Sequence, residues 1–166
     1  MNNLKKMVAF LLACLCLIMS VTPAMEASAA SGYSFKSKGA TATPGSSASS
    51  FIKANKKYFK KMKNSASCVA SSGYDVTREY KYFTLVTYAD KKNGEGKVES
   101  ITIKNKDVTT PEGAHCGMSV DELKEIYKNA KKLAKTYYVT KGKTKISFLI
   151  KDDKVSEINY LYTGKY

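Results

Sequence analysis

The sequence predicts an α+β fold in which two tandem helix-plus-antiparallel-strand repeats form one sheet with both helices on one face. The first observation is an internal echo: residues 97–103 read KVESITI and residues 154–160 read KVSEINY. A repeat of this size indicates a unit that buries its apolar face against a second copy. The second observation is that a helical apolar period precedes strand-like segments in both halves of the chain. One layered core is expected to join them.

The N-terminal 1–29 segment is typical of a secretory signal peptide. It has a basic start, an apolar run over residues 7–19, and an Ala27-Ser28-Ala29 cleavage site. The run is shorter than the roughly 20 residues that span a bilayer, so no transmembrane anchor is expected after cleavage; a retained N-terminal anchor is the alternative. We therefore expect a secreted or cell-surface protein with a first repeat over 30–110 and a second over 111–166.

The first repeat opens with a Ser-, Thr- and Gly-rich loop over residues 40–50. Apolar side chains then recur with a helical period, which predicts an amphipathic helix over 48–63 with its lysines facing solvent. Aromatic and β-branched residues predict a strand over 78–89. Asn93-Gly94 predicts the hairpin turn into a second strand over 97–104.

The second repeat begins with Ser119 and, three residues later, Glu122, which is the pattern of a capping box. The helical period then continues to about residue 135. Alternating segments predict three strands after it, over 137–140, 144–151 and 154–162. The turns between them are expected at Lys141-Gly142-Lys143 and at Asp152-Asp153.

Alignment of the two units pairs their helix starts and their last strands. The helix starts are 72 positions apart and the last strands 57, so the first unit holds additional residues around Cys68 and the Asn93 hairpin. The positions that this alignment predicts to be equivalent are Gly45 and Gly117, Ser47 and Ser119, Val98 and Val155, and Ile101 and Ile158.

Two cysteines, Cys68 and Cys116, remain after removal of the signal peptide, which carries the other two. In an oxidising compartment an even pair predicts a disulfide. The alternative is two separately buried thiols.

The chain has a formal net charge of +14, and Arg78 is its only arginine. Lysine lacks the planar fork with which arginine recognises phosphates and bases. Nucleic acid is therefore not an expected partner. An unknown protein or an anionic cell-surface polymer fits the charge better, and lysines that serve solubility alone are the other alternative.

These features resemble the β-lactamase inhibitory protein-like family and, more narrowly, uncharacterised secreted proteins of Gram-positive bacteria. The residues that carry the resemblance are residues 39–51, Ser67-Cys68, residues 80–88, residues 110–113, Gly117-Met118-Ser119, residues 138–145 and Asp153-Lys154-Val155. The resemblance implies a protein-binding sheet whose free face, if concave, grips a partner. It does not carry over β-lactamase inhibition, because the inhibitor's contact residues have no clear matches. Cys116 also departs from the pattern, since it precedes the second helix.

No catalytic, cofactor or metal site is expected. His115 and Cys116 are neighbours, and adjacent side chains rarely point at each other as a nucleophile pair requires. Ser119 is needed as a helix cap. Asp152 and Asp153 are too few for a calcium site and suit a turn.

We therefore expect a monomeric, non-enzymatic binding module that binds through its open sheet face. The alternative is an envelope-associated structural protein that is held electrostatically at the cell wall or membrane surface. Tyrosine supplies large amphipathic contact area at binding surfaces. The candidate binding residues on the predicted strands are Tyr80, Tyr82, Tyr88, Tyr138 and Leu161.

Overall fold

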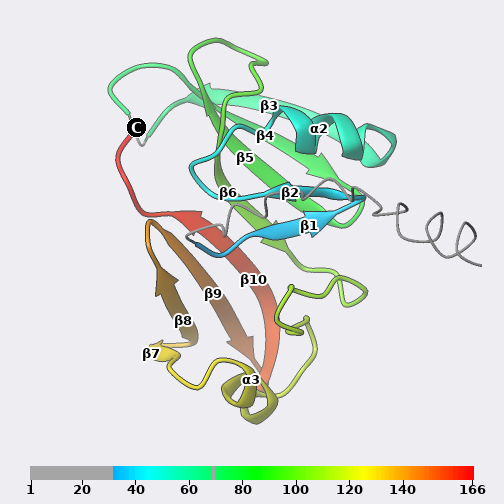
Figure 1. Cartoon of the computed structure of the whole chain (residues 1–166), viewed down its shortest axis with the longest axis vertical. Coiled ribbons are helices and arrows are strands. Elements are labelled where there is room, and N and C mark those ends of the chain that lie inside the picture. Colours follow the sequence, from blue (N-terminus) through cyan, green and yellow to red (C-terminus); the bar gives the residue numbers. More distant parts are fainter. Residues whose placement is uncertain (1–31, 69) are drawn as a thin grey trace, which may run out of the picture.

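Antiparallel sheet dominates the fold. A computed structural model describes residues 32–68 and 70–166, and these form one eight-stranded sheet, one two-stranded sheet and two short α-helices (Figure 1). The predicted signal peptide lies outside the described residues. The large sheet has the order β3-β4-β5-β6-β10-β9-β8-β7, with every neighbouring pair antiparallel.

The elements follow one another along the chain, with a long connection over residues 104–119 between β6 and α3. Their bounds are β1 Phe35–Ser37, β2 Ala40–Ala42, α2 Ser49–Asn55, the 3₁₀ turn η1 Lys56–Tyr58, β3 Phe59–Ala66, β4 Tyr74–Tyr80, β5 Phe83–Ala89, β6 Lys97–Ile103, α3 Val120–Ile126, β7 Lys131–Leu133, β8 Thr136–Lys141, β9 Thr144–Lys151 and β10 Lys154–Tyr162.

The predicted fold class of two helix-plus-strand repeats is wrong, because much of the expected helix is strand. The helix predicted over 48–63 ends at Asn55, and Phe59–Ala66 pairs with β4 instead. The helix predicted to residue 135 ends at Ile126, and Lys131–Leu133 pairs with β8. Short helices are marginal on their own. In both segments the backbone N–H and C=O groups that a helix would pair internally are paired with a neighbouring strand instead.

Several local predictions are confirmed. Ser119 and Glu122 form the predicted capping box. Asn93-Gly94 lies in the connection between β5 and β6, and Asn93 has a φ of 61°. The bounds of β9 and β10 match the prediction. The single strand predicted over 78–89 is wrong, because Lys81 and Tyr82 form a turn between β4 and β5.

The hydrophobic core lies against one face of the large sheet. Phe51 of α2 and Leu123 of α3 are both fully buried and belong to the same cluster. Phe35 of β1 packs on Phe51, and its ring centroid lies 5.9 Å from that of Tyr160 on β10. Figure 1 shows the β1–β2 hairpin and α2 on this side of the sheet.

The two similar segments have matching backbone contacts. The Gly45 N–H donates to the Val98 carbonyl at 2.7 Å, and the Gly117 N–H donates to the Val155 carbonyl at 2.7 Å. Val98, Ile101, Val155 and Ile158 are all buried. The segments form β6 and β10, which pair with each other in the middle of the sheet.

Candidate functional site

The face of the large sheet opposite the core is open over the described part of the chain. Strand register carries one row of side chains across it from edge to edge, because aligned residues on paired strands point to the same side. The row consists of Lys61, Glu79, Thr84, Thr102, Asn159, Ser147, Tyr138 and Lys131. Its centre is small and uncharged, and both ends carry a lysine.

A second row lies beside the first on the same face. It consists of Lys63, Thr77, Val86, Ser100, Leu161, Lys145 and Thr140. It too has hydroxyl and small apolar groups toward the middle, with lysines near both edges. We call the two rows together the open face.

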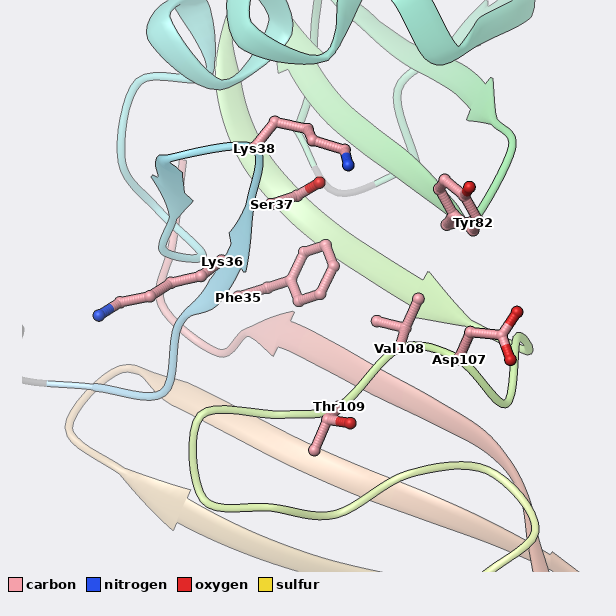
Figure 2. Close-up of a pocket in the computed structure, with 8 residues that line it drawn as sticks. All are labelled: Phe35, Lys36, Ser37, Lys38, Tyr82, Asp107, Val108 and Thr109. Carbon is pink, nitrogen blue, oxygen red and sulfur yellow. The ribbon is translucent and has the colours of Figure 1, made fainter.

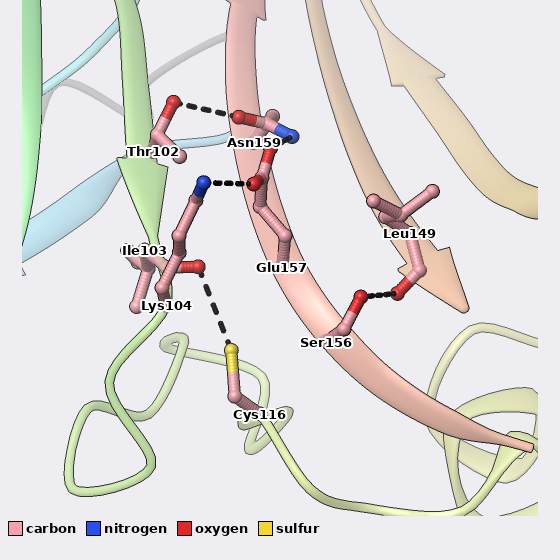
Figure 3. A network of polar contacts seen from close by, with 8 residues as sticks. All are labelled: Thr102, Ile103, Lys104, Cys116, Leu149, Ser156, Glu157 and Asn159. Atoms are coloured by element: carbon pink, nitrogen blue, oxygen red, sulfur yellow. Dashed lines mark hydrogen bonds and ion pairs between the residues drawn. The ribbon is translucent and has the colours of Figure 1, made fainter. Parts of the chain in front are cut away.

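A polar network fixes the centre of the open face (Figure 3). The Thr102 hydroxyl donates to Asn159 Oδ1 at 2.7 Å, and Asn159 Nδ2 donates to Glu157 Oε1 at 2.8 Å. Lys104 Nζ lies 2.9 Å from Glu157 Oε2. Although burial acts to raise the pKa of Glu157, the hydrogen bonds from Lys104 and Asn159 hold it below its ordinary value. Fixed side chains give a partner a preorganised surface.

Three of the five candidate binding residues lie on this side of the sheet. Tyr138 belongs to the first row and Leu161 to the second, and both are half-buried. Tyr88 is aligned with Lys97 near the end of β5 and is also half-buried. Tyr88, Tyr138 and Leu161 therefore keep exposed area on the open face but lie on separate strands.

The other two candidates lie elsewhere. Tyr80 is 5% exposed and stacks on Phe83 with ring centroids 4.6 Å apart, so its ring belongs to the core. Tyr82 is in the β4–β5 turn and lines a hollow on the helix side. Tyr80 shares the core side of β4 with Val76 and Arg78, because alternate residues of a strand point to the same face. Tyr82 lies outside the two rows but is half-buried, and it also lines a second hollow with Glu79, Thr84 and Thr102 of the first row.

That hollow has a volume of about 380 Å³ and lies beside β1 (Figure 2). Its lining residues are Phe35, Lys36, Ser37, Lys38, Tyr82, Asp107, Val108 and Thr109. In Figure 2 the Lys36 ammonium and the Asp107 carboxylate point away from each other. The Ser37 hydroxyl donates to Asn55 Oδ1 at 2.7 Å, which holds it in a structural contact. The polar groups of the hollow do not converge on one point.

Sequence reasoning missed a pair of neighbouring carboxyl groups, the buried Asp75 and the half-buried Glu99. Asp75 is 7% exposed, and its Oδ2 accepts from the Cys68 N–H at 3.1 Å and from Cys68 Sγ at 3.2 Å. Within the described residues, Asp75 Oδ1 and Glu99 Oε2 are buried without a hydrogen-bond partner. Burial and the nearby Asp75 raise the pKa of Glu99. No local pattern in the sequence predicts this pair. It depends on a register shift in the pairing of β5 with β6, which brings Glu99 near Asp75.

The C-terminal Tyr166 lies next to this pair. Its ring centroid is 4.9 Å from that of Tyr88, and its hydroxyl donates to the Val98 carbonyl at 3.1 Å. Burial, together with the charges of Glu99, Tyr162 and Asp75, raises its pKa. Tyr166 therefore covers one corner of the sheet, at Tyr88.

Cys68 and Cys116 are not bonded to each other in the structure. Cys68 is exposed, whereas Cys116 is buried with its Sγ 3.5 Å from the Ile103 carbonyl (Figure 3). The described residues contain no cluster of three or more His, Cys, Asp or Glu side chains that could hold a metal ion.

The part of the chain that the structure describes contains no helix long and apolar enough to cross a membrane.

Comparison of the chain with protein-family models, curated proteins and solved structures found no match.

Proposed function

We propose that this chain is a secreted, non-enzymatic binding protein that holds a protein partner with acidic side chains against the open face of its sheet. The observation that carries the proposal is the pair of side-chain rows that cross the sheet with small hydroxyl groups at the centre and lysines at the margins. A preorganised centre of small side chains suits a broad contact, and the marginal lysines favour an acidic rim on the partner.

Contact area on the face comes from its half-buried larger side chains. Tyr138 and Leu161 lie in the two rows, and Val86 is aligned with Ser100 between them. Half-buried aromatic and aliphatic groups that are held by neighbouring strands lose little entropy on binding. The network from Thr102 to Glu157 adds fixed donors and acceptors beside them.

Site-specific photocrosslinking tests this proposal. A benzophenone side chain is introduced at Thr84 or Leu161 on the open face, and at the exposed Lys128 as a matched control. Each protein is incubated with the surface extract of the producing cells, irradiated, and treated with protease. We expect one protease-sensitive adduct at Thr84 and Leu161, none at Lys128, and competition by unlabelled protein. Equal adducts at all three positions, or none, contradict the proposal.

Electrostatic retention at an anionic surface is the second candidate function, and the net charge of +14 favours it. Salt distinguishes the two, because about 0.5 M salt confines the attraction between exposed charges to a few ångströms. Binding to the open face predicts adducts at Thr84 and Leu161 that survive this salt. Retention by lysines alone predicts release of the protein from cells in about 0.5 M salt, with no specific adduct at either position.

A further inference from the structure

The outer edge of β3 differs from the opposite edge of the same sheet. β7, at the far end, is a strand of only three residues, whereas β3 has eight residues that are all exposed. Over the described part of the chain, β3 pairs with β4 on one side and with no strand on the other. A long unpaired edge presents backbone donors and acceptors that another strand can use.

Lysines on β3 determine which strand can pair there. Lys60, Lys61 and Lys63 lie within the strand, and Lys61 Nζ is 3.2 Å from Glu79 Oε2. A second copy of this chain would bring like charges together across the new pair, which is unfavourable. The same lysines attract a strand that carries carboxylates, so the edge selects against self-association and for an acidic partner.

An apolar groove adjoins this edge on the helix side of the sheet. Its volume is about 400 Å³, and it is lined by Ile52, Lys53, Lys56, Phe59, Met62, Arg78, Tyr80, Asn93 and Glu95. Phe59 is 44% exposed and Met62 is 37% exposed, and both come from β3. Large apolar side chains that stay exposed beside an unpaired edge are typical of a binding surface.

Arg78 adds positive charge at the base of the groove. It is 4% exposed, and its guanidinium donates to Thr87 Oγ1 at 2.9 Å and to the carbonyls of Asn93, at 3.2 Å, and Gly94. These partners are neutral, so they satisfy the hydrogen bonds of the guanidinium but do not neutralise its positive charge. Lys53 and Lys56 also line the groove, and Glu95 is the one carboxylate among its lining residues. The groove therefore favours anionic over cationic occupants.

Strand register specifies how an occupant alternates. Met62 is aligned with Arg78 and points to the groove side, whereas Lys61 and Lys63 are aligned with Glu79 and Thr77 and point to the open face. Successive side chains of a strand added beside β3 would face the same two sides in turn. One side of the added strand meets an apolar groove, and the other meets lysines.

From this geometry we propose that the β3 edge and its groove bind an extended peptide segment of a partner protein in which acidic and apolar residues alternate. The segment adds a ninth strand to the sheet antiparallel or parallel to β3. Its apolar side chains contact Phe59 and Met62, and its carboxylates lie beside Lys61 and Lys63. Phe59 and Met62 lie on the groove side of β3, whereas Lys61 and Lys63 are also the marginal lysines of the two rows of the open face. The proposal therefore shares these two lysines with the proposed function and goes beyond it in the strand edge and the groove.

The test uses a synthetic peptide, acetyl-Glu-Leu-Glu-Leu-Glu-Leu-Glu-amide, labelled for fluorescence anisotropy. We expect saturable binding below about 1 mM. Lys63→Glu should weaken binding roughly fivefold, because it replaces an attractive cross-strand pair with a repulsive one. Met62→Ser should weaken it by loss of apolar contact, and Lys128→Glu is the matched control that should leave it unchanged.

Two further measurements separate strand addition from general attraction to lysines. A peptide with every amide N-methylated has no backbone donor on either edge and cannot pair with a strand, so its binding should be lost. Hydrogen exchange of residues 59–66 should slow when the parent peptide is added. Equal binding of the methylated peptide, unchanged exchange in β3, or no saturable binding of the parent peptide overturns the proposal.

Discussion

The Thr102 hydroxyl donates a hydrogen bond to Asn159 Oδ1 at 2.7 Å, and the two residues are 57 positions apart, which is the offset between the two similar segments. Equivalent positions of β6 and β10 therefore contact each other. Ile101 is aligned with Tyr160, and Ile103 with Ile158, as a local two-fold axis between Thr102 and Asn159 requires. The similarity in sequence thus falls at the centre of the sheet, where two antiparallel strands present nearly the same surface to each other.

Loss of this hydrogen bond should destabilise the protein. Thr102→Val keeps the side-chain shape and leaves Asn159 Oδ1 without its donor, which should lower the free energy of unfolding by about 0.5–1.5 kcal/mol. Urea denaturation measures the change. Thr84→Val is the matched control, because Thr84 is aligned with Thr102 in the same row. An equal loss in both variants would contradict a specific role of the Thr102–Asn159 bond.

The capping box of α3 gives a second prediction. The Ser119 hydroxyl accepts from the Glu122 N–H at 3.3 Å, and Glu122 Oε2 accepts from the Ser119 N–H at 2.8 Å. Ser119→Ala should lower the free energy of unfolding by about 1 kcal/mol. Ser47→Ala should cost less, because the N-cap residue of α2 is Ala48, which has no side-chain cap, and Ser47 Oγ accepts only a long bond of 3.4 Å from the Ser49 N–H. Thermal or urea unfolding of both variants checks the order, and a larger loss at Ser47 would refute it.

The half-buried carboxyl of Glu99 should make stability depend on pH. Burial and Asp75 raise its pKa above the ordinary value of 4.5, so the folded protein binds this proton more tightly than the unfolded chain does. The contribution of Glu99 to stability is then present in acid and is lost as pH rises through the raised pKa. Glu99→Gln keeps the neutral form, and it should stabilise the protein at pH 7.5 relative to wild type.

Urea denaturation of wild type and Glu99→Gln at about pH 4 and about pH 7.5 measures this effect. The gain from the substitution should be larger at the higher pH. Glu125→Gln changes an exposed carboxyl on α3 and serves as the control, with little difference expected. A gain from Glu99→Gln that is larger in acid would have the wrong sign for a raised pKa.

The two cysteines should differ in reactivity. Cys68 is exposed, and Cys116 is buried in the core. Without reduction, a maleimide should label Cys68 in the folded protein and Cys116 only after denaturation. Hydrogen bonding to Asp75 raises the pKa of Cys68, so its labelling should accelerate as pH increases above neutral. Mass spectrometry of the protein reads both sites, and labelling that requires prior reduction would show that the two thiols form the disulfide expected from the sequence.

Local sequence determined the turns and caps. Asn93 and Asp153 both have positive φ, at 61° and 57°, and both lie in turns that their residue types predict. The alternation in residues 144–151 and 154–162 gave two strands with the observed bounds, and it placed Tyr160 on the core side and Leu161 on the open face. Each of these features depends on backbone preferences or side-chain periodicity within a few residues.

Strand pairing decided the rest, because it depends on partners far along the chain. Phe59 and Met62 keep a helical spacing, yet β4 offers a complete set of backbone partners and residues 59–66 become an edge strand. A register shift between β5 and β6 brings Glu99 near Asp75, and this result is not visible in a local pattern. The sequence by itself determined where the chain turns and which faces of its last strands are apolar. The tertiary structure decided which segments become strands and which side chains share the open face, since both follow from contacts between distant residues.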